Sequence, residues 1–308
     1  MSIGYLFLLG SLVGFGGLGI FHKVADHPDC RPRLIALSLL FWGCVLTLLY
    51  TVVFEAKGLH FSSKVLLIGA AGGLFSSSAL FVFQTGLKYG KISTSWLVLN
   101  LSMSLPILIS LFFFNEKVNW IKCAGIVLVL CAIVMLWRDK KIDLDKTDAA
   151  TAASAGHHTK WLILMMLAFV FNGLSASTSK VLVGEGEGDS TWQFFVIMYG
   201  VGCLATGMVS CVQKDLPNRR EFATGSIMAV CSVAGNVLLT LALKHGVEGA
   251  VAFPSANGGS LTLVVLAGVL LFKEHVHPIG RAGIAFGIGA ILLLVMEPTI
   301  LSYFQGHH

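Results

Sequence analysis

Long apolar runs recur along the whole chain, and they constrain its fold more than any other feature. Ten runs of about 20 residues lie near 3–22, 34–54, 65–87, 92–114, 119–137, 161–180, 191–212, 223–243, 249–272 and 278–296. With 56% apolar residues, 12% charged residues and a mean hydropathy of +0.82, the chain has too little charge to cover a soluble surface. The solvent around most of it is therefore predicted to be lipid.

The runs predict membrane-spanning helices and exclude barrel strands. A barrel strand alternates polar and apolar residues over about ten positions, whereas the stretches at 127–136 and 163–171 are apolar throughout. A helix satisfies its own backbone hydrogen bonds inside a bilayer, where no water is present to do so. We therefore expect an all-α integral membrane protein with ten transmembrane helices.

The second half of the sequence repeats features of the first half. In each half a glutamate closes an apolar run, and a Gly-Ile pair follows that glutamate nine residues later. The corresponding residues are Glu116, Gly125 and Ile126 in the first half and Glu274, Gly283 and Ile284 in the second, 158 positions on. Because each copy holds five runs, an odd number, the second copy is predicted to enter the membrane upside down. Such inverted repeats enclose a substrate site near the middle of the membrane.

The repeat also predicts the domain organisation. We expect a first five-helix repeat at 1–137, a polar linker at 138–160, a second five-helix repeat at 161–297 and a short C-terminal tail at 298–308. The connections after the odd-numbered runs, counted together with Arg281 in the first turn of the tenth run, hold 15 of the 21 basic residues, which predicts that both termini lie outside the cytoplasm.

Uncharged polar and aromatic side chains inside the runs are the candidate substrate-binding residues, because lipid offers them no partner. These candidates are Gln84, Trp96, Asn100, Asn172, Asn236, Asn257 and Ser260. Prolines and glycines interrupt the fourth and ninth runs, and interruptions of this kind often mark the binding site of a transporter. Small polar residues also let helices pack closely, so a purely structural role stays open.

Two lysines end equivalent helices of the two halves. Lys23 closes the first run and Lys180 the sixth, and in an inverted repeat they lie near opposite membrane faces. A lysine at a helix end can reach the lipid headgroups, or it can place a positive charge at the mouth of a pathway. Both readings stay open.

Several chemistries lack a signature in the sequence. No carboxylate lies in the middle of a run, which disfavours binding an organic cation. Nucleotide-binding loops, nucleophile elbows and metal-ligand spacings are also missing from the sequence, so we expect no enzyme, cofactor, metal site or nucleic-acid partner. Six of the seven cysteines fall inside runs, which excludes a disulfide framework.

The ten runs, the paired glutamate signatures and the two lysines together resemble the drug/metabolite transporter superfamily, and within it the EamA-like transporters with two five-helix repeats. The resemblance implies that helices 1–4 and 6–9 surround a central cavity. It also implies that helices 5 and 10 lie outside this cavity, often in a homodimer contact. Met103 and Leu261 stand where the family usually has proline, so helix bends need not follow the family pattern.

The sequence thus predicts a secondary transporter that moves a small neutral or zwitterionic metabolite by alternating access. Export of an amino acid or a related compound is the first expectation, with a proton or a counter-substrate as a candidate partner. Sugar or polyol uptake and organic-cation or drug efflux are alternatives, and a non-transporting receptor or assembly subunit is the alternative of another class. The expected location is the cytoplasmic (inner) membrane of a bacterium or archaeon.

Overall fold

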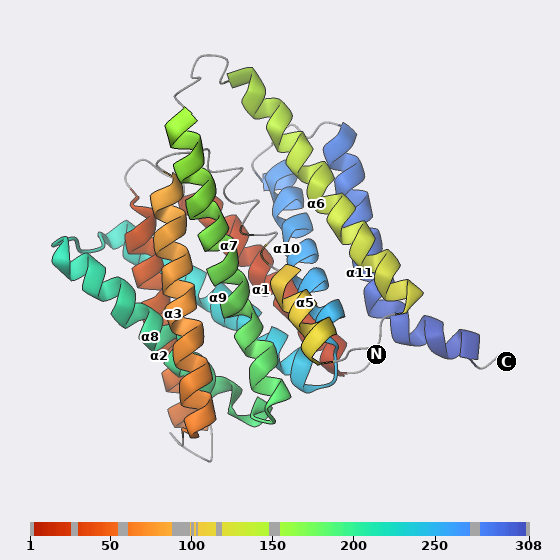
Figure 1. Cartoon of the computed structure of the whole chain (residues 1–308), viewed down its shortest axis with the longest axis horizontal. Coiled ribbons are helices and arrows are strands. Elements are labelled where there is room, and N and C mark those ends of the chain that lie inside the picture. Colours follow the sequence, from red (N-terminus) through yellow and green to blue (C-terminus); the bar gives the residue numbers. More distant parts are fainter. Residues whose placement is uncertain are drawn as a thin grey trace.

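The structure of the chain is a computed structural model. It describes residues 3–25, 30–54, 61–87, 99, 102, 104–114, 119–147, 155–271 and 278–305. The elements within these residues are helices that lie side by side in a bundle (Figure 1). This confirms the expectation of an all-α chain.

The helices follow one another along the chain. They are α1 (Ile3–Ala25), α2 (Pro32–Phe54), α3 (Ser63–Leu87), α5 (Ser104–Phe113), α6 (Trp120–Thr147), α7 (Ala155–Gly184), the 3₁₀ helix η1 (Gly188–Ser190), α8 (Thr191–Val212), α9 (Arg219–Lys244), α10 (Gly249–Leu271) and α11 (Pro278–Gln305).

Most helices match the predicted apolar runs, and the differences lie at the polar ends. α6 continues to Thr147 and α7 begins at Ala155, so both helices extend into the segment at 138–160. α11 likewise continues to Gln305, beyond the expected end of the second repeat. A helix satisfies its own backbone hydrogen bonds in water as well as in lipid, so it need not stop where the apolar run stops.

Six helical segments within the described residues are long and apolar enough to cross a membrane. They are Ile3–His22, Pro32–Phe54, Ser63–Phe83, Lys160–Gly184, Gly188–Val212 and Arg219–Lys244. Large apolar side chains such as Val13, Leu67 and Met208 are exposed on their outer faces. Exposed apolar surface of this extent is the normal outer surface of a protein surrounded by lipid. The prediction of ten spans is larger than the number that these residues support.

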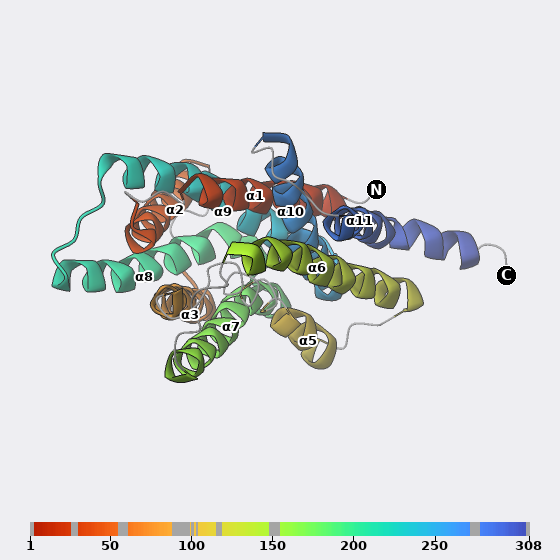
Figure 2. The same ribbon diagram turned by 90° about the horizontal axis from the view of Figure 1, so that it is seen from above.

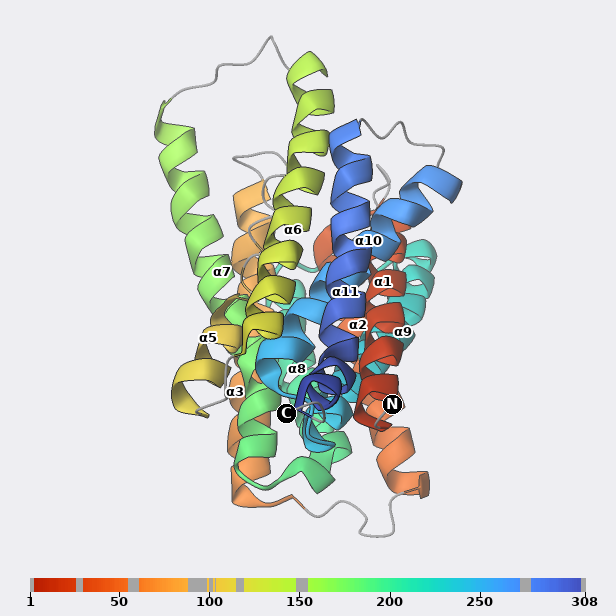
Figure 3. The same cartoon turned by 90° about the vertical axis from the view of Figure 1, so that its right-hand side faces the viewer.

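The two sides of the bundle are formed by different helices. Figure 2 shows α6 and α11 on one side and α2, α3 and α8 on the other. α6 packs mainly on α11, and both contact α10. In Figure 3 the start of α1 and the end of α11 lie at one end of the bundle, and the facing ends of α6 and α7 lie at the other.

α9 is the central helix of the bundle. It packs on α1, α2, α8 and α10, and 56% of the residues in its most apolar stretch are buried, compared with 28–33% in the other five spans. Glycines allow α1 to approach it closely. A Cβ atom added at Gly14 would lie 2.6 Å from the backbone nitrogen and 2.8 Å from the Cα atom of Gly235. Contacts of this kind between small residues are a main source of helix association in membranes.

The close approach of α1 and α9 predicts a stability change. Gly14→Ala would push two backbones apart, and overpacking of this kind costs about 1–3 kcal/mol. We expect the free energy of unfolding to fall by that amount, measured by titrating the purified protein with SDS in mixed micelles. Gly207→Ala in α8 is the matched control, since its added Cβ would meet one atom at 3.8 Å, an ordinary contact. Equal stability of the two variants would contradict the prediction.

Candidate functional site

The middle of α9 carries a polar cluster that faces α8. Asn236 Nδ2 donates to the carbonyl oxygen of Ser232 (2.9 Å), and it lies 3.3 Å from the hydroxyl oxygens of both Ser232 and Tyr199. These two hydroxyls are 2.8 Å from each other. The Tyr199 side chain is only 2% exposed, and its ring lies against Gly43 of α2. The cluster therefore points into the protein, where α2, α8 and α9 meet.

A second polar cluster joins α7 to its neighbours. Asn172 Nδ2 donates to Ser102 Oγ (2.7 Å) and lies 3.4 Å from the carbonyl oxygen of Leu99, in the chain that precedes α5. One turn further along α7, Ser175 Oγ donates to the carbonyl oxygen of Gly72 in α3 (3.1 Å). An amide and a hydroxyl in the middle of α7 thus tie this helix to two other parts of the first half.

Two of the predicted site residues, Asn257 and Ser260 of α10, bond within their own helix. Asn257 Nδ2 donates to the carbonyl oxygen of Phe253 (3.0 Å), and Ser260 Oγ donates to the carbonyl oxygen of Asn257 (2.9 Å). Pro254 lies inside the same helix. Local bonds of this kind leave the side chains near the helix surface, and they do not link α10 to another element.

The structure brings the predicted site residues together only in part. The described amides of Asn172, Asn236 and Asn257 bond to three separate sets of partners. Gln84 lies near the end of α3, and its side chain is outside the described residues, as are Trp96 and Asn100. Tyr199 and Ser102 were not among the predicted residues. Each of these two residues carries a hydroxyl inside an apolar run. Such residues are too common in membrane helices to indicate a binding site.

Of the two lysines at the helix ends, the structure describes the side chain of Lys180 only. Lys180 is half-buried in α7, and its Nζ lies 5.2 Å from the centroid of the Phe114 ring, a cation–π contact at the end of α5. Lys23 lies in the last turn of α1, and its side chain is outside the described residues.

A cavity of about 270 Å³ lies between α3, α7 and α8. The hydroxyl side chains of Ser77, Ser78 and Thr206 line it, and Arg33 at the start of α2 also contributes to its wall. The other lining residues are apolar, namely Leu80, Phe81, Val82, Phe171, Ala205 and Val209. This volume lies just below the range of about 300–1,000 Å³ that is usual for small-molecule pockets.

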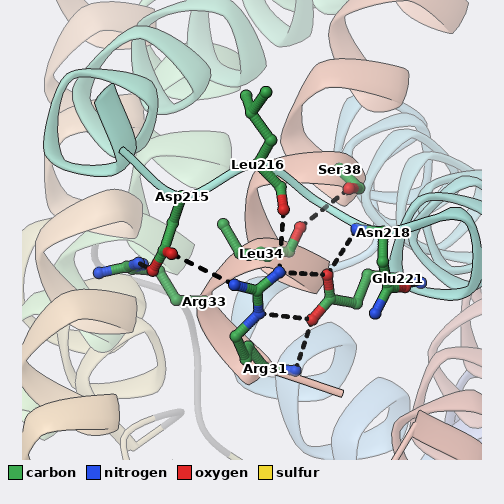
Figure 4. Close-up of polar contacts among 8 residues, drawn as sticks. All are labelled: Arg31, Arg33, Leu34, Ser38, Asp215, Leu216, Asn218 and Glu221. Atoms are coloured by element: carbon green, nitrogen blue, oxygen red, sulfur yellow. Dashed lines mark hydrogen bonds and ion pairs between the residues drawn. The ribbon is translucent and has the colours of Figure 1, made fainter. Parts of the chain in front are cut away.

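An ion cluster joins the two halves of the chain at the end of the bundle where α2 and α9 begin (Figure 4). Arg31 donates through Nε (3.1 Å) and Nη2 (3.2 Å) to the two carboxylate oxygens of Glu221, and its backbone N–H donates to the same carboxylate at 2.7 Å. Arg31 also donates to Asp215 (3.2 Å) and to the carbonyl oxygen of Leu216 (2.9 Å). Arg33 donates to the other oxygen of Asp215. We refer to Arg31, Arg33, Asp215 and Glu221 as the Arg31 cluster.

Local structure fixes the acidic side of the Arg31 cluster. Asn218 and Glu221 form a capping box, in which Glu221 N–H donates to Asn218 Oδ1 (2.8 Å) and Asn218 N–H donates to Glu221 Oε2 (2.7 Å). A carboxylate in the first turn is also stabilised by the helix dipole. The hydrogen bond to Glu221 raises the pKa of Arg31 above its already high ordinary value, so Arg31 stays charged at any physiological pH.

Sequence analysis did not identify this cluster. The predicted run of α9 begins at 223, which leaves Glu221 in a loop, whereas its side chain is 0% exposed. The pattern Asn-x-x-Glu at 218–221 was the available signal, because it is typical of a capping box. It indicates where the helix begins, but it does not indicate that Arg31, 190 residues earlier, reaches the same carboxylate.

A second set of contacts joins the halves where α7 ends and α3 begins. Lys64 Nζ donates to Glu185 at 2.8 Å, and Ser62 Oγ donates to Glu187 at 2.9 Å. The hydrogen bond and the charge of Lys64 lower the pKa of Glu185. The Lys64 and Glu185 side chains are 59% and 50% exposed, so water screens the pair and it adds little stability. We refer to these two interactions as the Lys64 contacts.

The described residues contain no group of three or more His, Cys, Asp or Glu side chains arranged to hold a metal ion. Among the described residues, the polar side chains in the middle of α7 and α9 include Asn172, Ser232 and Asn236, whose amides and hydroxyl can form hydrogen bonds.

One family model matches the first half of the chain. Residues 2–138 match the model of the EamA-like transporter family. Among curated proteins, none matches the chain.

A solved structure described as "Crystal structure of protein" shares the fold over nearly the whole length. The superposition has a TM-score of 0.71 at 16% sequence identity, and it covers 98% of each chain. At this identity the likeness shows the fold alone. The apolar helices and the EamA-like match support a multi-pass integral membrane protein.

The polar cluster on α9 predicts a stability change. Tyr199→Phe removes one hydroxyl and leaves Ser232 and Asn236 without that partner in a buried place, which costs about 1–3 kcal/mol. We expect the free energy of unfolding in SDS titrations to fall by that amount. Tyr50→Phe is the matched control, because Tyr50 is exposed and stacks on Trp192 with 3.8 Å between ring centroids. If both variants unfold at the same SDS fraction, the hydroxyl network is not stabilising.

Proposed function

We propose that this chain is a secondary transporter that moves a small neutral or zwitterionic metabolite across the membrane by alternating access. The observation that carries the proposal is the match of residues 2–138 to a transporter family, in a chain whose central helix presents uncharged polar groups to the interior. An amino acid or a related compound is the substrate class that we put first, and export is the direction to be tested first.

The proposal includes two inverted five-helix repeats, and the packing of the described helices supports it. If α1 corresponds to α7 and α3 to α9, the contact of α1 with α9 is equivalent to that of α7 with α3. The contact of α2 with α9 is likewise equivalent to that of α8 with α3, and all four contacts are extensive. Equivalent contacts of this kind are expected around a pseudo-twofold axis, where such transporters place their substrate.

The chemistry of the interior supports a substrate without net charge. In the middle of the described spans the polar groups are amides and hydroxyls, including Asn172, Asn236 and Tyr199. The buried carboxylate of Glu221 lies in the first turn of α9 and is paired with Arg31. An unpaired acid would be expected for an organic cation. Amides and hydroxyls can replace the hydration of a polar, neutral or zwitterionic molecule by hydrogen bonds.

Counterflow into proteoliposomes tests this function. Vesicles loaded with an unlabelled amino acid, and containing the purified protein, should accumulate the labelled amino acid from outside. Asn236→Leu and Asn257→Leu each remove an amide from the proposed site, so we expect the initial rate to fall at least roughly tenfold, as for the loss of one charged or buried hydrogen bond. Ser226→Ala is the matched control on α9, since this exposed hydroxyl donates to its own helix at Ala223.

A thermal-shift screen identifies candidate ligands before counterflow is measured. The screen uses a panel of neutral and zwitterionic amino acids, sugars and amines. A ligand that stabilises the protein and is not accumulated would point to a receptor and contradict the transport proposal. Native rates in both asparagine variants would remove these residues from the site.

A further inference from the structure

The Arg31 cluster and the Lys64 contacts lie at opposite ends of the bundle. The first precedes α2 and the second follows it, and α2 has 23 residues. At about 1.5 Å per residue the two sets are roughly 33 Å apart, close to the thickness of about 30 Å of the hydrocarbon core. Each set joins the first half of the chain to the second, so one tie between the halves lies near each membrane face.

The two sets occupy equivalent positions in the two halves. Arg31 and Glu187 are 156 positions apart, and so are Ser62 and Asn218. Ser62 caps α3 by accepting from the N–H of Val65 (3.2 Å), as Asn218 caps α9. In both sets, the loop after the first helix of one half contacts the cap of the third helix of the other half.

The two sets differ in strength because they differ in burial. Glu221 is fully buried and accepts four hydrogen bonds, three of them from Arg31. The Lys64 contacts are solvent-exposed. Exposed pairs are screened by water and contribute little, whereas a buried carboxylate depends on the partners that replace its hydration. The end of the bundle at the Arg31 cluster is therefore held closed more firmly than the opposite end.

We propose that the Arg31 cluster is a latch that holds this end of the transport pathway closed and that breaks when this end opens to solution. The inference rests on the proposed transport function, since alternating access requires contacts that differ between the two states. A charged latch can open reversibly because both groups regain water when they separate. Arg31 is already 47% exposed, so opening mainly rehydrates Glu221.

A native cysteine reports whether the latch is closed. Cys30 directly precedes Arg31, is half-buried, and packs against a cluster formed by Ala25, Ile35 and Met228. Met228 belongs to α9, so the Cys30 thiol lies across the junction that the latch holds together. Separation of α9 from the start of α2 would expose this thiol to water.

The experiment measures the modification rate of Cys30 by a membrane-impermeant maleimide, with each cysteine followed by peptide mass spectrometry. Glu221→Gln removes the charge and keeps the shape, and Arg31→Gln removes its partner. We expect each to raise the Cys30 rate roughly tenfold, the effect of losing a charged hydrogen bond. The Cys30 rate of the double variant should not exceed that of the faster single variant, because both changes break the same interaction.

Two charge-removing variants and one cysteine serve as controls. Arg219→Gln removes a charge from the same turn of α9, and Lys64→Gln breaks the exposed contact at the opposite end. Both should leave the Cys30 rate within about twofold of native, since surface charges of this kind contribute little. Cys211, which is exposed at the end of α8, should react at the native rate in every variant.

A misfolded variant is recognised because the half-buried cysteines Cys44, Cys203 and Cys231 all react faster as well. If Glu221→Gln is misfolded, Asp215→Asn is the variant that tests the latch. Asp215, in the loop before α9, is partly exposed and accepts hydrogen bonds from Arg31 and Arg33. This variant should raise the Cys30 rate about threefold, as expected for a weaker, partly exposed pair. Native Cys30 rates in folded Glu221→Gln, or in Asp215→Asn where that variant decides, would overturn the latch.

The readout separates the two proposals. A tenfold rise at Cys30 in a protein that shows no counterflow with any ligand would retain the latch as a conformational contact and overturn the transport function. Counterflow by the native chain, with Cys30 rates that do not respond to Glu221→Gln, would overturn the latch and leave the transport function standing.

Discussion

A bilayer offers no hydrogen-bond partners, and this constraint governs every polar group in the spans of the chain. Most hydroxyls in the spans satisfy this constraint by hydrogen-bonding within their own helix. Ser38, Thr47 and Ser177 each donate to a carbonyl oxygen four residues earlier in their own helix. The amides of Asn172 and Asn236 need more partners than one helix turn supplies, and they reach neighbouring elements. Polar contacts between helices are thus made by these amides and by a few hydroxyls, such as that of Ser175, which donates to the carbonyl oxygen of Gly72 in α3.

Close packing around α9 makes these contacts possible. Gly14 of α1 and Gly43 of α2 provide the space that the backbone of Gly235 and the ring of Tyr199 occupy. Because α9 belongs to the second half and α1 and α2 to the first, the tightest helix contacts of the bundle lie between the halves. A junction that holds both the polar cluster and the Arg31 cluster is one that a movement of the two halves must rearrange.

The sequence predicted much of the helix pattern. The apolar runs near 3–22, 34–54 and 191–212 correspond to α1, α2 and α8 within a few residues. Asn236 was predicted to bind substrate, which stays a prediction; its amide lies 3.3 Å from the Tyr199 hydroxyl. Glu221 was placed outside the helix because hydropathy detects only the apolar part of a span. α6 and α7 extend beyond their runs for the same reason, since their polar turns carry no hydropathy signal.

The sequence by itself determined that this chain is a helical membrane protein, because the length and apolarity of each span are local properties. Tertiary structure alone decided which polar groups meet. Arg31 and Glu221 are 190 residues apart, and Tyr199 and Ser232 belong to different helices. Their pairing depends on which helix faces which, and at what depth. Both are set by the shapes of many side chains packed together, and no single run in the sequence encodes them.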